Sequence, residues 1–473
     1  PKTVRWRITP DMDLQLPEAV LVWSDEGIGG VSDAYHRLYR ERLVGGPWRD
    51  EPRPVVFNSW EGVYFDYDED VLVEMAAAAR DLGAEAFVLD DGWFGQRDDD
   101  TSSLGDWSVD LRKLPSGLPD LVSRLNDLGL RFGIWIEPEM VSARSRLFEQ
   151  HPEWAVGHSG RPRSELRHQY VLDLSNPEVV DHLERVIGNV LSSAPIGYVK
   201  WDHNRVITEP FGASLPPERQ GEFFHRYMLG VYDLYSRLIE RFPEILFESC
   251  AAGGGRNDPG MLAFAPQVWI SDDTDAVERQ RIQYGASMVY PLVAMAAHVS
   301  AVPNHQLGRV TPLSTRAAVA FFGNLGYELD PRSLGEAEAA AVRAQIAWYK
   351  ERRELIHRGR FHRLRSPFEG DRNETAWMVV GHGASRALVG WYRTLTRPLP
   401  GPSLLRLRGL DPAARYEIGV WPESDDGIAR ANVGSRGGDE LMSQGLFLDD
   451  DAWESQIRGD YQARIFELRE VTT

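Results

Sequence analysis

The chain of 473 residues has little cysteine, few basic side chains for its acidic content, and no long apolar runs. Cys250 is its single cysteine, so no disulfide can form within the chain, and a reducing compartment suits it. Acidic residues outnumber basic ones by 71 to 52, and the net charge of -19 repels nucleic acids and anionic membrane surfaces. No apolar run approaches the roughly 20 residues that span a bilayer. We therefore expect a cytoplasmic protein with neither nucleic-acid nor membrane partners.

The first residues also lack an initiating methionine and the pattern of a signal peptide. Residues 1–11 are charged, and residues 4–8 read like a strand. These features suggest a processed or trimmed piece of a longer protein. The length exceeds what one core usually holds, so we expect one large domain and at least one smaller one.

From about Pro54 to Asn304, short apolar runs alternate with longer amphipathic stretches, which is typical of βα units around a parallel sheet. Glycine or proline stands at the ends of the amphipathic stretches, as helix ends require. Eight such units in about 250 residues predict a (β/α)8 barrel, with a last long helix over residues 336–357. The expected strands are 55–60, 86–90, 131–136, 170–174, 197–202, 245–249, 267–271 and 290–297, and the clearest helices are 69–82, 118–128, 177–193 and 223–241.

After Arg360 the pattern changes to alternating apolar and polar residues broken by Gly, Pro and Asp. This alternation predicts a smaller antiparallel β domain. The barrel is therefore assigned to residues 54–360 and the β domain to residues 361–473, with strands expected over 377–380, 387–392, 404–408 and 464–467.

The active site of such a barrel lies at the carboxyl ends of its strands. Lys200, Asp202 and Asn204 alternate at one of these ends, so all three point into the mouth. An ammonium beside a carboxylate favours the ionised form that a nucleophile needs. A structural ion pair in the barrel wall is the alternative interpretation.

Three acids, Asp272, Asp273 and Asp275, follow the expected strand at 267–271. Crowded carboxyls beside an aromatic residue raise a pKa, as a general acid requires. Spacing alone leaves the choice among them open. Asp273 or Asp275 suits the cap of a helix beginning at Ala276, and Asp272 lies nearest the strand end.

Adjacent carboxylates at Asp90 and Asp91 suit the hydroxyls of a sugar, because each accepts several hydrogen bonds. A metal site is the competing interpretation, but no ligand set with standard spacing lies nearby, so we expect neither metal nor cofactor. Trp60, Trp135 and Trp269 at strand ends offer flat apolar faces for a sugar ring, or serve as core residues.

An ordered set of motifs through the whole barrel resembles the α-galactosidases of glycoside hydrolase family 36. Members of that family have a (β/α)8 barrel followed by a C-terminal β domain, in agreement with the pattern above. The motifs are Asn58–Glu61, Leu89–Phe94, Trp135–Met140, Lys200–Asp202, Glu248–Ala251, Gly253–Arg256 and Ser271–Asp275.

The resemblance implies hydrolysis of terminal α-linked galactose from oligosaccharides such as melibiose or raffinose, with retention by double displacement. It implies that Asp202 is the nucleophile and Asp272 the acid/base. Asp90 and Asp91 would bind the 4- and 6-hydroxyls of galactose. The rest of the sugar subsite would be formed by Trp60, Arg167, Lys200, Asn204, Cys250 and Gly253.

The sequence departs from the family pattern at two places. Members usually carry a large N-terminal β-sandwich, whereas residues 1–53 suffice only for a linker or a remnant of that domain. Because the N-terminal β-sandwich commonly helps members of the family to form oligomers, the sequence leaves open whether this chain forms a homo-oligomer. His203 stands where the family usually has methionine, and strand alternation turns it away from Asp202, toward a packing or supporting role.

Three other functions stay open at this stage. An α-N-acetylgalactosaminidase needs room beside the sugar 2-position, but Cys250 and the glycines after it resemble the galactosidase version. A transferase making raffinose-type oligosaccharides would share the first half-reaction. A catalytically silent galactoside-binding protein would need neither a nucleophile nor an acid.

Overall fold

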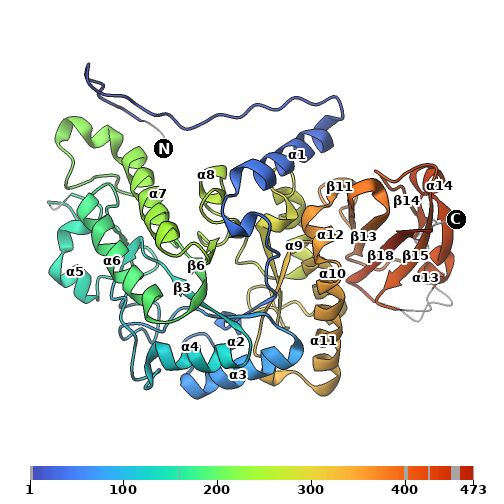
Figure 1. The fold of residues 1–473 in the computed structure, drawn as a ribbon, viewed down its shortest axis with the longest axis horizontal. Coiled ribbons are helices and arrows are strands. Elements are labelled where there is room, and N and C mark those ends of the chain that lie inside the picture. Colours follow the sequence, from blue (N-terminus) through green and yellow to red (C-terminus); the bar gives the residue numbers. More distant parts are fainter. Residues whose placement is uncertain (1–3, 159, 399–402, 424–426, 449–458, 472–473) are drawn as a thin grey trace.

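Eight parallel strands close into a barrel surrounded by helices (Figure 1). The computed structural model describes residues 4–158, 160–398, 403–423, 427–448 and 459–471. The barrel and the antiparallel sheet that follows it confirm the predicted fold class. In spatial order the strands are β1 (Val56–Asn58), β10 (Asn324–Glu328), β9 (Met295–Ser300), β8 (Gln267–Trp269), β7 (Leu246–Ser249), β6 (Ile196–Trp201), β3 (Arg131–Ile136) and β2 (Ala86–Leu89).

Local sequence signals set the helix boundaries. Asp68 accepts a hydrogen bond from the Val71 amide at the start of α3 (Glu69–Leu82), and Gly83 ends that helix at φ +102°. α6 (Pro177–Ser193) begins with proline behind the capping side chain of Asn176. The remaining α-helices are α1 (Gly27–Leu38), α2 (Trp60–Val63), α4 (Gly117–Asp127), α5 (Arg146–Gln150), α7 (Phe223–Arg241), α8 (Pro259–Leu262), α9 (Ala276–Ala286), α10 (Leu313–Ala320), α11 (Glu336–Lys350), α12 (Arg353–Arg358), α13 (Gly427–Asn432) and α14 (Gly438–Ser443).

The inner face of the barrel is layered. Val56, Val88, Tyr198 and Leu246 pack with Trp48 in one buried apolar cluster. Because side chains alternate along a strand, residues two positions further on point inward as well, in a layer nearer the mouth. The apolar layer thus supports a polar layer that contains the candidate site.

Two of the predicted barrel strands need correction. The strand expected at residues 170–174 is the short β5 (Tyr170–Val171), which pairs antiparallel with β4 (Met140–Val141) outside the barrel. The eighth barrel strand is instead β10, which the sequence interpretation missed. Periodicity fails at β10 because all its residues are buried, as are most of α10 just before it.

Two other boundaries also differ from the expectation. β9 begins later than expected, because Leu292–Ala294 form a 3-10 turn. The long helix expected at 336–357 is interrupted between α11 and α12.

The C-terminal region forms a six-stranded antiparallel sheet beside the barrel (Figure 1). Its own core contains Met378, Val389, Ile418 and Phe466. The strand expected at 404–408 is shorter, and β14 (Leu404–Leu405) pairs with β17 (Leu446–Phe447) apart from the main sheet. In spatial order the sheet contains β11 (Arg360–Arg365), β12 (Glu374–Val380), β13 (Arg386–Arg393), β18 (Gln462–Glu470), β15 (Arg415–Trp421) and β16 (Gly434–Gly437).

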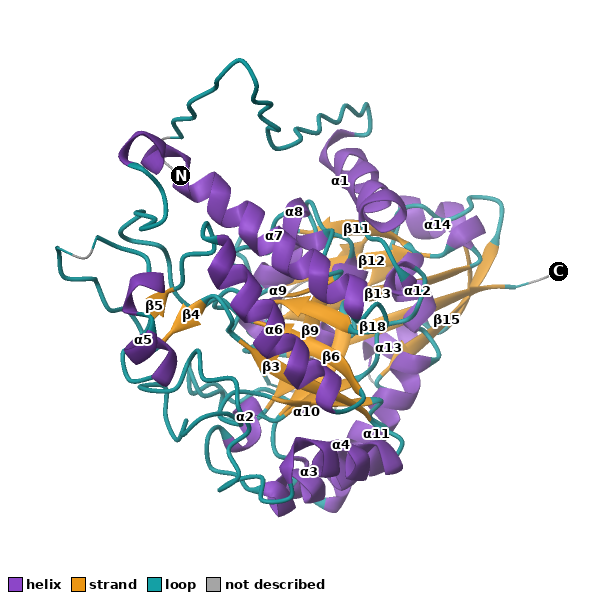
Figure 2. Cartoon of the chain, turned by 60° about the vertical axis from the view of Figure 1, so that its left-hand side comes forward, coloured by secondary structure: helices purple, strands orange, loops and turns teal. Residues whose placement is uncertain are grey.

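Residues 4–26 cross above α7 and α8 before α1 begins (Figures 1 and 2). No strand forms among the described residues before β1, so the strand suggested by residues 4–8 is not observed. One backbone hydrogen bond, from the Arg5 amide to the Gly221 carbonyl, ties this stretch to the barrel side. Among the helices that the structure describes, none is long and apolar enough to cross a membrane.

Candidate active site

The carboxylate of Asp202 lies directly after β6 and accepts three hydrogen bonds. The residue is 7% exposed. Trp135 Nε1 (3.3 Å) and Asn204 Nδ2 (2.6 Å) donate to its Oδ2, and the His203 amide donates to Oδ1 at 2.8 Å. Such donors stabilise a carboxylate. The structure therefore brings together Trp135, Asn204 and Asp202, three residues predicted from the sequence.

Lys200 forms its ion pair with Asp90 rather than with Asp202. Its Nζ lies 2.9 Å from Asp90 Oδ2, and both side chains are buried. Burial is the largest single influence and lowers the pKa of Lys200, but Asp90 together with other nearby acids, Glu328 among them, more than offsets it and holds that pKa well above its usual range. The predicted contact between Lys200 and Asp202 is thus corrected. Asn58 Nδ2 donates to the same Asp90 oxygen at 2.8 Å.

Asp91 is held by Arg97, which the sequence interpretation missed. Arg97 Nε (2.6 Å) and a terminal Arg97 nitrogen (2.7 Å) each donate to one oxygen of Asp91. Burial raises the pKa of Asp91, and the Arg97 charge opposes this shift. Each carboxylate oxygen still has a second lone pair for a ligand hydroxyl. No spacing motif in the sequence indicates this pair.

Asp272 follows β8 and is exposed at the mouth. Trp269 Nε1 donates to its Oδ1 at 3.0 Å. Partial withdrawal of this carboxyl from water raises the pKa of Asp272, and the negative charge of Asp202 raises it further. The two acids therefore lie within electrostatic reach of each other.

The other two acids of this motif have local structural contacts. Asp275 caps α9 by accepting hydrogen bonds from the Val277 and Glu278 amides, as predicted for a capping residue. Asp273 accepts from the Asp275 amide at 3.0 Å. Of the three acids in the motif, Asp272 is therefore the one whose pKa is raised by burial and by the charge of Asp202.

Gly253 allows the loop after β7 to approach the Asp272 loop closely. Its φ is +79°, and a Cβ at this position would lie 2.6 Å from Ser271 Cα and 2.7 Å from the Asp272 nitrogen. Any other residue would push the Asp272 loop away. Cys250, at the start of the same loop, is buried, and burial followed by the Asp202 charge raises the pKa of its thiol.

The remaining predicted residues differ in position. Trp60 is half-buried at the start of α2, and Trp269 is buried with its ring 4.4 Å from that of His298. Arg167 lies exposed on a turn at φ +54°, outside the barrel wall. Its predicted place at the end of a barrel strand is wrong, because the strand after it belongs to the small β4–β5 pair. Its contribution to a sugar subsite stays a prediction.

Two buried acids that follow β3 were also missed. Burial and the Asp202 charge raise the pKa of Glu137 to about 8, and its Oε1 accepts from the Asn204 amide at 2.5 Å. Glu139 accepts from Trp201 Nε1 at 2.9 Å and from Arg256 at 2.7 and 2.8 Å. Glu137 and Glu139 lie two and four residues after Trp135, near the end of β3. This alternation is the feature of the sequence that could have indicated them.

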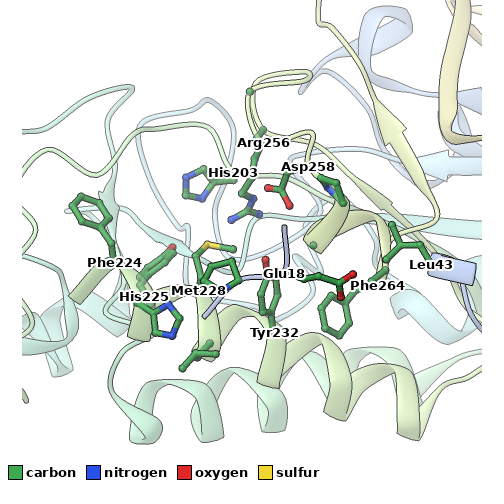
Figure 3. Close-up of a pocket in the computed structure, with 18 of the residues that line it drawn as sticks. Glu18, Leu43, His203, Phe224, His225, Met228, Tyr232, Arg256, Asp258 and Phe264 are labelled. Atoms are coloured by element: carbon green, nitrogen blue, oxygen red, sulfur yellow. The ribbon is translucent and has the colours of Figure 1, made fainter. Parts of the chain in front are cut away.

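His203 turns away from Asp202, as strand alternation predicted. Its Nδ1 lies 3.3 Å from Glu139 Oε2. The side chain also lines a cavity of about 1620 Å³ between the N-terminal segment and α7, where His203 and Arg256 face Met228 and Tyr232 (Figure 3). This cavity adjoins the candidate site at Asn204 but is not lined by Asp202 or Asp272. Within the described residues, no group of three or more His, Cys, Asp or Glu could hold a metal ion.

Two protein-family models match this chain. The melibiase family matches residues 13–359, and the glycosyl hydrolase family 36 C-terminal domain matches residues 374–468. The chain belongs to the melibiase family. The resemblance to glycoside hydrolase family 36 is thereby confirmed.

Members of the family with known structures align over nearly all of this melibiase-family chain. The α-galactosidase AgaA of Geobacillus stearothermophilus is 53% identical over 443 residues, covering 94% of this chain and 59% of AgaA. The crystal structure of an AgaA variant with raffinose matches at a TM-score of 0.90 and 51% identity, covering 95% of this chain and 60% of that chain. A variant complex with stachyose matches at 0.89 and 52%, with the same coverage. The chain thus spans about three fifths of the length of these relatives.

Proposed function

We propose that this chain acts as a retaining α-galactosidase, with Asp202 as nucleophile and Asp272 as acid/base. One observation carries the proposal: two carboxyls with different surroundings lie at one barrel mouth. Asp202 accepts three hydrogen bonds that suit an anion. Asp272 has a raised pKa that suits a proton donor. Glycoside cleavage by a pair of carboxyls requires such a division, and the match to glycoside hydrolase family 36 supports retention.

The reaction proceeds in two displacements. Asp202 attacks the anomeric carbon, the bond to the leaving oxygen breaks, and Asp272 gives its proton to that oxygen. Asp272, now ionised, then takes a proton from water as the water oxygen attacks the same carbon and releases Asp202. Two inversions return the α configuration, and the acid of the first step is the base of the second.

Galactose selectivity is assigned to the carboxylates after β2. Asp90 and Asp91 are buried and oriented by Lys200, Asn58 and Arg97, so their remaining lone pairs can accept the 4- and 6-hydroxyls. An epimer with a misplaced hydroxyl would leave a buried acceptor unsatisfied. We assign contact with the apolar faces and the edges of the sugar ring to five further residues: Trp60, Trp135, Trp269, Cys250 and Gly253.

The AgaA complexes support both the residues and the substrate class. The variant bound to raffinose has an aspartate replaced by asparagine, and the variant bound to stachyose has another aspartate replaced by alanine. Those two positions are separated in AgaA by the same number of residues as Asp272 and Asp202 in this chain. We infer that this chain takes α-galactosyl oligosaccharides of the raffinose type.

Hydrolysis of p-nitrophenyl α-galactoside by the purified chain tests the proposal. Nitrophenol should be released, and proton NMR should detect α-galactose before mutarotation. The α-glucoside should react at least ~10⁴-fold more slowly. With a poor leaving group, kcat/KM should fall as the pH rises through the raised pKa of Asp272, because the first step needs its proton. Initial release of β-galactose, or comparable rates for both epimers, would contradict the proposal.

A further inference from the structure

Arg279 is a buried cation whose hydrogen bonds run to the backbone on both sides of Asp272. The residue is 2% exposed. Its Nε donates to the Asp273 carbonyl at 2.7 Å, and a terminal nitrogen donates to the Ser271 carbonyl at 2.6 Å. The other terminal nitrogen donates to the Ala296 carbonyl in β9 at 3.3 Å. The Asp272 loop is thereby fastened to the neighbouring barrel strand.

The same guanidinium packs against the side chain that holds the Asp272 carboxyl. Its central carbon lies 4.4 Å from the centroid of the Trp269 ring. Trp269 Nε1 in turn donates to Asp272 Oδ1. Arg279 therefore fixes Asp272 at two levels, through the main chain beside it and through the indole that orients its carboxyl.

The helix that carries Arg279 begins at the same loop. Asp275 caps α9, and Arg279 lies one turn further on. Because helical side chains point toward the N-terminus of their helix, the Arg279 side chain reaches back to the residues that precede α9. Among the described residues, no carboxylate lies within ion-pair distance of Arg279. Burial lowers its pKa to about 10, which leaves it charged at neutral pH. A buried cation bonded to three carbonyls is a costly way to hold a loop, which points to a need for exact placement.

We propose that Arg279 is a positioning residue for the acid/base. It holds the Asp272 carboxyl in the position from which it can protonate the leaving oxygen. The inference rests on the proposed function of Asp272. Arginine donates to the Asp273 and Ser271 carbonyls from two separate nitrogens held in one rigid plane, whereas the single nitrogen of lysine cannot occupy both of those positions. Proton transfer needs donor and acceptor within hydrogen-bond reach, so a small displacement of the loop weakens acid catalysis selectively.

Arg279→Lys tests this role through its dependence on the leaving group. For methyl α-galactoside, whose leaving oxygen needs the proton, kcat/KM should fall by about 100-fold. For 2,4-dinitrophenyl α-galactoside, whose leaving group needs little protonation, the fall should stay below about threefold. A residue that only supports the fold would lower both values equally.

Arg53→Lys is the matched control. Arg53 is also 2% exposed, and it donates to the carbonyls of Trp48, Glu51 and Pro266. Pro266 lies just before β8, at the opposite end of the strand that leads to Asp272. Arg53→Lys should lose stability for the same reasons as Arg279→Lys, yet leave the ratio of the two kcat/KM values at the wild-type value.

Asp272→Ala separates failure of this inference from failure of the proposed function. If Asp272→Ala lacks the leaving-group dependence, the acid/base assignment itself is wrong. If Asp272→Ala shows it and Arg279→Lys does not, only the role of Arg279 is overturned. Should Arg279→Lys not fold, the neutral Arg279→Gln takes its place. Failure of both to fold, with Arg53→Lys folded, would assign Arg279 to the fold and also overturn the inference.

Discussion

Asp202 and Asp272 are chemically identical side chains that differ in what their carboxyls contact. Asp202 is buried among an indole N–H, an amide N–H and a backbone N–H. Asp272 is at the mouth with the Trp269 N–H, and the charge of Asp202 acts on it. Their environments, rather than their identities, therefore support the two different roles proposed for them.

Removal of each carboxyl should produce a different failure. Asp202→Ala prevents formation of the covalent intermediate, so even an activated aryl galactoside should stay intact. Asp272→Ala should release a burst of phenol from the same substrate and then turn over slowly, because no base activates water. A stopped-flow trace of phenol release distinguishes the two variants.

Azide, which needs no general base, should rescue the variants with opposite stereochemistry. In Asp272→Ala it attacks the β-linked intermediate from the opposite face and yields the α-galactosyl azide. In Asp202→Ala it replaces the nucleophile in a single inversion and yields the β azide. NMR of the products identifies the anomer of each galactosyl azide. The same anomer from both variants would refute the assignment of roles.

At this scale strand alternation predicts which side chains share a face, but not which of them form a pair. Strand alternation placed Asp202 and Asn204 together and turned His203 away. It could not predict that Lys200 of β6 pairs with Asp90 after β2, two strands away, because that depends on the order of the strands around the barrel. The Arg97 contact with Asp91 was missed for a related reason, since it depends on the path of an irregular loop.

Glu139 links several elements near Asp202, the proposed nucleophile. It follows β3 and accepts from Trp201 at the end of β6, from Tyr227 in α7 and from Arg256 in the loop after β7. Burial disfavours its charge, but Arg256 and then His203 hold the pKa of Glu139 well below its usual value. The ionised carboxylate therefore stabilises the packing of these elements around the residue that precedes Asp202.

Glu139→Gln should destabilise the protein strongly, because it leaves the largely buried Arg256 without its carboxylate. The expected loss is about 3 to 5 kcal/mol near neutral pH. Tyr227→Phe, which removes one hydrogen bond to the same carboxylate, should cost about 1.5 to 3 kcal/mol. Urea unfolding followed by tryptophan fluorescence measures both losses.

The stability difference between wild type and Glu139→Gln should depend on pH in one direction. The folded pKa of Glu139 is depressed, so its contribution is fully present above the ordinary glutamate pKa of 4.5 and is lost as the pH falls below it. The two proteins should therefore converge in acid. A difference that stays constant from neutral pH to well below pH 4 would contradict an ionic role.

The boundaries of elements were predictable where the signal is local. The limits of α3 and α6 follow from Asp68, Gly83, Asn176 and Pro177, each of which acts on its own helix end. The choice of barrel strands is a tertiary property. Tyr170–Val171 and Asn324–Glu328 are both short runs, and only the pairing of their backbones decides which one closes the barrel.

At the scale of the whole molecule, the barrel and the C-terminal sheet share one hydrophobic core. Trp377 and Tyr392 of the sheet pack in the same cluster as Phe322, which lies just before β10. The Tyr392 hydroxyl donates to the Ala318 carbonyl in α10 at 2.9 Å, and Arg352 pairs with Glu467 of β18 at 2.8 Å. The sheet therefore buries apolar surface of the barrel and completes its packing.

This shared core should make the barrel and the sheet unfold in a single calorimetric transition. Trp377→Ala opens a cavity at the junction and should lower the free energy of unfolding by about 3 to 5 kcal/mol. Trp391→Ala is the matched control, because Trp391 is equally buried but packs only in the sheet's own cluster. If the two parts are coupled, both variants shift the same single peak to lower temperature. If they are independent, Trp391→Ala would melt the sheet early and leave a second peak at the wild-type temperature, which would contradict the prediction.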